Sequence, residues 1–68
     1  MMTKTITLTL DDVGMECMVH MASHEYKFYG ELEKDRRECG FTGLADEYKE
    51  KADFWKRVLE AIGADPVR

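Results

Sequence analysis

The order of apolar and polar residues along the chain predicts one β-strand followed by two helices. Apolar and polar positions alternate over residues 3–10, the period of a strand. The apolar positions are Ile6, Leu8 and Leu10, and the polar positions between them are Thr5, Thr7 and Thr9. Because these residues favour β structure and no second clear strand follows, the unpaired backbone groups of this strand need a partner.

A long helix is predicted over residues 12–39. Asp11 and Asp12 provide a side-chain acceptor and negative charge at its start, as helix N-termini prefer. Winding the segment at 100° per residue gathers apolar side chains on one face. These are Val13, Cys17, Met21, Phe28, Leu32 and Cys39. A competing interpretation makes residues 11–14 a hairpin turn and residues 15–21 a second strand, but methionine and glutamate favour the helix.

A second helix is predicted over residues 43–62, after a short glycine-containing loop. Its apolar stripe is about 120° wide. The stripe consists of Leu44, Tyr48, Ala52, Trp55, Val58, Leu59 and Ile62. Because the loop is short, the second helix must fold back antiparallel on the first. The sequence therefore predicts one small domain, residues 1–68, of the α+β class but mostly helical, with the order β-α-α and a short C-terminal tail.

The two predicted helices differ in length, and this difference predicts a homodimer. At 1.5 Å per residue they measure about 40 Å and about 28 Å, so the second helix leaves the start of the first uncovered. A chain of 68 residues also buries too little surface for a secure core. We therefore expect two strands to pair across a twofold axis, above the uncovered helix ends. The expected dimer interface consists of Ile6, Leu8, Leu10, Met15, Met18 and Val19.

Composition and cysteine spacing narrow the class of protein. With 44% hydrophobic and 35% charged residues, the chain is typical of neither a disordered nor a membrane-embedded protein. Neither a membrane-spanning run nor a signal peptide is recognisable. Cys17 and Cys39 would lie about 33 Å apart on one helix, which excludes an intrachain disulfide. Free thiols favour a cytoplasmic location.

The side chains with chemical potential predict binding rather than catalysis. Cys17, His20 and His24 have the spacing C-x2-H-x3-H, but the fourth donor that zinc prefers is not evident. Ser23 and His24 diverge on a helix, and the glycines match no nucleotide-binding pattern. We therefore predict no enzyme activity, no metal and no cofactor. The candidates for binding a partner are Thr5, Thr7, Thr9, His20 and His24.

Two resemblances add to this interpretation. The opening Thr-Lys-Thr-Ile-Thr-Leu-Thr-Leu, followed by Asp-Asp, and the turn Gly-Phe-Thr-Gly at 40–43 resemble ribbon-helix-helix DNA-binding regulators. That resemblance implies a paired ribbon in the major groove. The first helix is about twice the usual length for this family. Lys4 is also the only lysine or arginine among the first 26 residues, which contain four acidic residues, whereas DNA binding requires positive charge there.

The whole pattern resembles, more closely, small accessory proteins of bacteriophages and related mobile elements. In these proteins a similar strand precedes an acidic helical hairpin, here with Ala-Asp-Glu-Tyr-Lys-Glu-Lys-Ala-Asp-Phe-Trp-Lys-Arg-Val-Leu at 45–59. The resemblance implies a non-catalytic binder that inhibits a host or defence-system protein in the bacterial cytoplasm. The net charge of -4 is compatible with a basic partner surface. We expect a small acidic homodimer that binds another protein; the alternative is a ribbon-helix-helix-like DNA-binding regulator.

Overall fold

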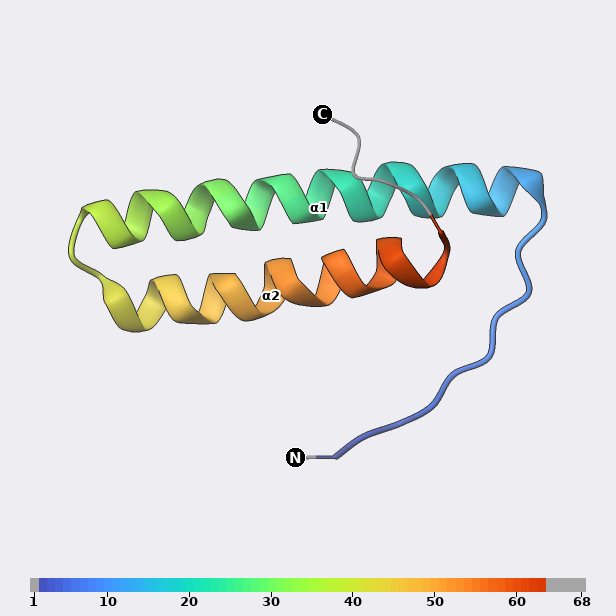
Figure 1. Ribbon diagram of the computed structural model, residues 1–68, viewed down its shortest axis with the longest axis horizontal. Coiled ribbons are helices and arrows are strands. Elements are labelled where there is room, and N and C mark those ends of the chain that lie inside the picture. The colour runs from blue at the N-terminus through green and yellow to red at the C-terminus, as the bar shows by residue number, and fades with distance from the viewer. Residues whose placement is uncertain (1, 64–68) are drawn as a thin grey trace.

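The computed structural model describes residues 2–63, which form an antiparallel hairpin of two helices (Figure 1). Helix α1 spans Asp12–Glu38 and helix α2 spans Thr42–Ala61. The predicted helical hairpin is therefore confirmed, with both helices beginning and ending within one residue of the expected positions. From residue 64 onward, the predicted C-terminal tail lies outside the described part of the chain.

The predicted strand over residues 3–10 is wrong, and with it the α+β class. Residues 2–10 lead away from the N-terminal end of α1 without secondary structure, and residues 2–63 contain no sheet (Figure 1). A strand is stabilised by hydrogen bonds to a neighbouring strand, and a single segment has no such neighbour. Ile6 and Leu8 are consequently exposed and Leu10 is half-buried. The competing strand over residues 15–21 is wrong as well, because these residues belong to α1.

Helix α1 begins where its sequence provides a cap. The backbone N–H of Gly14 donates a hydrogen bond of 2.7 Å to Oδ1 of Asp11, the first residue before the helix. The side chain of Leu10 folds over the same turn, only 3.2 Å from where a Cβ on Gly14 would stand. The first turn of α1 is thus fixed by the hydrogen bond from Gly14 to Asp11 and by the packing of Leu10 against Gly14.

The loop between the helices is a Schellman turn, which reverses the chain within a few residues. The N–H of Phe41 donates to the carbonyl of Arg36 at 2.8 Å, and that of Gly40 donates to Arg37 at 3.2 Å. Gly40 has a φ of 86°, a left-handed conformation that glycine adopts without the steric cost of a Cβ. This turn directs α2 back along α1.

The contact between the helices is made largely by small side chains. Among the described residues, the buried hydrophobic ones are Ala22, Ala45, Ala52 and Leu59. On α2 they recur every seven residues, the repeat that keeps one side of a helix against its neighbour. Alanines let the two backbones approach closely, but they bury little apolar surface. Leu59 is the one large side chain among the four.

The apolar face predicted for α1 is largely exposed, so it is not the side of the helix that contacts α2. Val13 is 68% exposed, Met21 59% and Phe28 46%. The side of α1 that contacts α2 is instead centred near Ala22, about 100° around the helix from Met21. The periodicity located a broad apolar arc correctly, but the close approach at alanine determined which part of the arc is covered.

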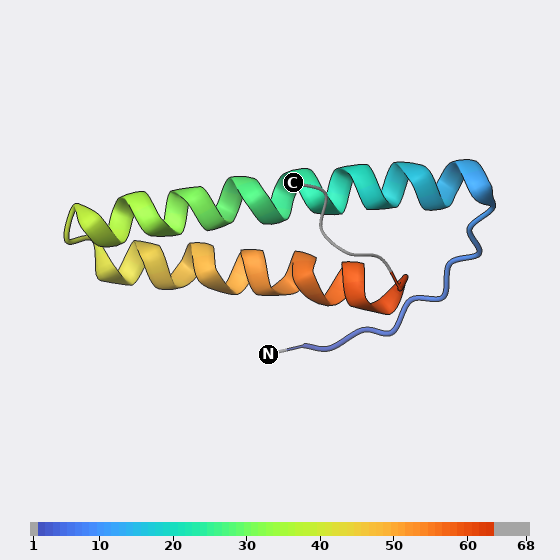
Figure 2. The same ribbon diagram turned by 45° about the horizontal axis from the view of Figure 1, so that its top comes forward.

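The hairpin is one layer of helices, 13 Å along its shortest axis. Two views related by a turn of 45° show α1 running on past the end of α2 (Figures 1 and 2). The expected difference in length is therefore present, with 27 residues in α1 and 20 in α2. In the described part of the chain, neither helix has the length and apolarity needed to cross a membrane.

Candidate functional site

The two broad faces of the helical layer differ in character. On one face, charged residues from both helices face one another across the contact. On the other face, both helices present apolar and aromatic side chains. We call the second surface the apolar face and define it by Met18, Met21, Phe28 and Leu32 of α1 with Leu44, Tyr48, Trp55, Val58 and Ile62 of α2. This division makes the hairpin amphipathic as a whole, beyond the amphipathicity of each helix.

The charged face contains an ion-pair network that joins the helices. The guanidinium of Arg37 donates to Glu33 at 3.0 Å on its own helix and to Asp46 at 3.1 Å on α2. These hydrogen bonds raise the pKa of Arg37. Nearby, Lys49 donates to Asp53 at 3.1 Å, and this bond raises the pKa of Lys49. The charges of these five residues are therefore paired within the hairpin.

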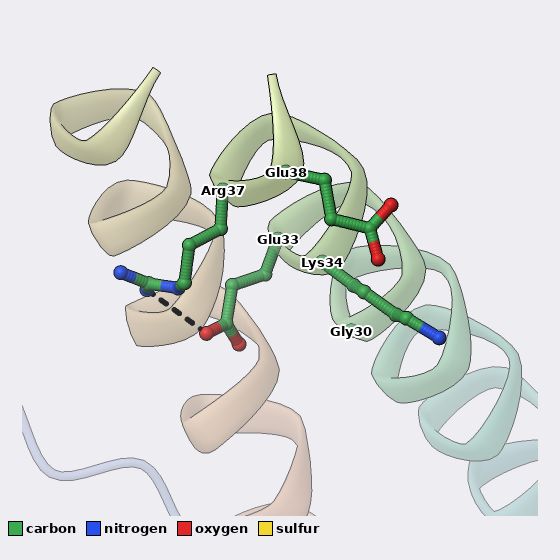
Figure 3. Close-up of a pocket in the computed structure, with 5 residues that line it drawn as sticks. All are labelled: Gly30, Glu33, Lys34, Arg37 and Glu38. Atoms are coloured by element: carbon green, nitrogen blue, oxygen red, sulfur yellow. Dashed lines mark hydrogen bonds and ion pairs between the residues drawn. The ribbon is translucent and has the colours of Figure 1, made fainter. Parts of the chain in front are cut away.

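A shallow hollow of about 330 Å³ lies beside this network (Figure 3). It is lined by Gly30, Glu33, Lys34, Arg37 and Glu38. Arg37 and Glu33 turn toward α2 and pair with each other, whereas Lys34 and Glu38 point the other way (Figure 3). Because the lining mixes both signs of charge and lies open to solvent, it has no concentrated field for one ligand.

The apolar face has a continuous aromatic array that crosses from one helix to the other. The rings of Tyr29 and Tyr48 stack with centroids 6.0 Å apart, and Phe28 packs edge-on to Tyr29 at 5.2 Å. Lys51 lies over both tyrosine rings, with Nζ 5.5 Å and 5.9 Å from their centroids. His24 continues the array at 6.4 Å from Phe28. Aromatic and methionine side chains are the types enriched in protein–protein interfaces.

The two histidines proposed for partner binding lie on the outer side of α1, away from α2. Both side chains are exposed. Nε2 of His20 is 4.0 Å from Glu16, and Nδ1 of His24 is 3.5 Å from Glu25. Together with exposed Val13 and Cys17, they form a surface that we call the N-terminal ridge: Val13, Cys17, His20 and His24. The ridge belongs to the first half of α1.

The remaining predicted site residues differ in their exposure to solvent. Thr5, Thr7 and Thr9 are exposed on the N-terminal segment. Of the six residues predicted for the dimer interface, Ile6 and Leu8 lie exposed on the same segment, and the others are half-buried. The half-buried ones are Leu10, Met15, Met18 and Val19. The absence of the strand separates the first group from the second, so one chain does not gather all six residues into one patch.

Neither the cysteines nor the histidines gather into a larger cluster. Cys17 and Cys39 are both exposed and not bridged. Within residues 2–63, no three side chains of His, Cys, Asp or Glu are placed to hold a metal ion together. The helix keeps Cys17, His20 and His24 on the same broad side, but it directs them outward rather than toward a common point.

A surface role for Phe28 and Tyr48 was not predicted from the sequence. A signal for this role was present. Positions 18, 21, 25, 28 and 32 of α1, and 44, 48, 51, 55, 58 and 62 of α2, each follow the alternating spacing of three and four residues. This spacing marks a stripe that faces a neighbouring helix. The stripes lie beside those used in the hairpin contact.

Comparisons with known proteins give no relative for this chain. No protein-family model matches it, and neither the curated proteins nor the solved structures contain a match.

Proposed function

We propose that this protein is a small acidic homodimer that works without catalysis, by binding another protein. The observation that carries the proposal is the apolar face, on which Met21 is 59% exposed and Phe28 46% exposed. Contiguous apolar side chains with polar neighbours favour association with other proteins. Since they lie on regular helix, the surface is preorganised and loses little conformational freedom on binding.

The need for a second copy follows from the core. Among residues 2–63, three of the four buried hydrophobic residues are alanines, so the hairpin alone removes little apolar surface from water. Globular domains pack at least two layers of secondary structure around a core, and this hairpin is a single layer. Association with another chain would supply the missing layer.

The N-terminal ridge and the threonines of residues 3–10 are the surfaces we assign to the partner. The ridge combines an apolar anchor at Val13 with the polar rings of His20 and His24. The resemblance to bacteriophage accessory proteins directs the search to host or defence-system proteins with a basic surface, in the bacterial cytoplasm. Exposed, unbridged thiols are compatible with that reducing compartment. The alternative DNA-binding function loses support, because residues 3–10 do not form the strand from which a paired ribbon is built.

Two measurements test this function. Tagged protein is used to capture partners from bacterial lysate, in parallel with the double variant Val13→Glu/His24→Glu. We expect a protein that is retained by the wild type and lost with the variant. Titration with duplex DNA at low salt separates the alternative function, since a ribbon-type regulator binds with a steep salt dependence. DNA binding of that kind, or retention of the same proteins by the double variant, would contradict the proposal.

A further inference from the structure

We infer that the apolar face is the homodimer interface, and that a second copy of the hairpin packs on it to form a four-helix bundle. This inference rests on the proposed homodimer and assigns it a surface. The second copy is favoured over other occupants by the spacing of the side chains, the charges on the face and the area that it offers.

The spacing of side chains gives each helix two neighbouring stripes. One stripe is used within the hairpin: Ala45, Ala52 and Leu59 of α2 contact the side of α1 near Ala22. The other stripe, with alternating spacings of three and four residues, is the one that forms the apolar face. A helix with two such stripes is typical of a four-helix bundle, in which every helix contacts two neighbours. A hairpin supplies only one neighbour for each helix, and a second identical hairpin supplies the other.

The charges on the face are self-complementary. Within the two stripes of three-four spacing, Glu25 and Lys51 are the charged residues, one on each helix. A twofold interface presents the same patch from both sides, so each copy offers an acid and a base to its partner. An interface of this composition has no net charge to repel an identical surface. A basic or acidic partner would find no matching field there.

The area of the face is adequate for a stable dimer. Two helices about 10 Å wide, side by side over the roughly 30 Å length of α2, give a projected area of about 600 Å². Because side chains make a helical surface uneven, its accessible area exceeds this projection. A standard protein–protein interface buries about 800 Å² on each partner. The apolar face is thus of the size that a stable dimer uses.

The test is the mass of the full chain in solution, by sedimentation equilibrium or light scattering. Interfaces of standard size have dissociation constants of about 1 µM or below, so at about 100 µM we expect twice the chain mass of 7.9 kDa. Met21→Glu and Phe28→Glu each place a carboxylate on the apolar face at an already exposed position. Both are expected to shift the mass toward that of one chain. Phe41→Glu is the matched control, because Phe41 is an exposed phenylalanine of the loop outside the face.

Folding is followed in the same samples by far-UV circular dichroism. If the variants lose both their helix content and the dimer, their mass no longer tests the interface, and the dimer is tested on the wild type instead. Its thermal midpoint must then rise with chain concentration, as for any protein whose folding is coupled to association. A wild-type dimer that both Met21→Glu and Phe28→Glu leave intact would overturn the assigned surface but not the homodimer. A helical wild type with the mass of one chain would overturn both, while capture of another protein would still be tested separately.

Discussion

Truncation of Leu59 to alanine should remove a large part of the stability of this protein. Leu59 is only 1% exposed and, among the described residues, is the one large side chain of the buried hydrophobic set, whose other members are alanines. Replacing a buried leucine by alanine costs about 2–5 kcal/mol, from lost transfer free energy and from the cavity left behind. A chain of this length has a total stability of about 3–10 kcal/mol. We therefore expect Leu59→Ala to lower the free energy of unfolding by about 3 kcal/mol.

The measurement is urea denaturation followed by far-UV circular dichroism, at one chain concentration for all variants. Leu8→Ala is the matched control, because the same atoms are removed from an exposed side chain of the N-terminal segment. Its free energy of unfolding should stay within about 0.5 kcal/mol of the wild type. If both variants unfold at the same urea concentration, burial of Leu59 does not contribute the expected stability.

Two glycines of the hairpin should respond in opposite ways to alanine. Gly40→Ala should lower the free energy of unfolding by about 1–2 kcal/mol, since a Cβ is costly at a φ of 86°. Gly43→Ala is the control: Gly43 lies in α2 without a positive φ and with open space around it, so its alanine variant should not lower the free energy of unfolding. Gly30→Ala should raise the free energy of unfolding by about 0.5–1 kcal/mol, because α1 has open space at this position and alanine favours helix. The same denaturation experiment measures each change; a neutral Gly40→Ala or a destabilising Gly30→Ala would contradict the respective argument.

The helices were predictable from the sequence because their signals are local. Asp11 caps α1 through a hydrogen bond three residues along the chain, and Gly40 ends it through a turn of a few residues. Such interactions depend only on neighbouring residues, so they can be recognised without knowledge of the fold. The reversal of the chain then follows from the shortness of the loop. In the same way, the difference in helix length could be inferred from the positions of the caps.

The strand was not predictable because a strand is not a local structure. The alternation from Thr3 to Leu10 shows that these residues suit a pleated surface, but it does not supply the neighbour that pairs with them. Within residues 2–63 no segment offers such a neighbour, and the backbone groups of residues 3–10 remain available to water. Propensity was therefore overruled by the absence of a pairing partner in the described chain.

The prediction for the apolar face of α1 failed for a different reason, and this reason bears on the proposed dimer. Winding the sequence groups residues by hydrophobicity, so it drew one apolar face through Met21 and Phe28. The hairpin instead closes at Ala22, because two backbones approach most closely where the side chains between them are small. Further along the contact, Tyr29 of α1 stacks on Tyr48 of α2. Met21 and Phe28 are suited to a neighbour at a greater distance, such as a second layer of helices. In the proposed dimer, the broad apolar arc of α1 contains one stripe for the close helix and one for the more distant layer.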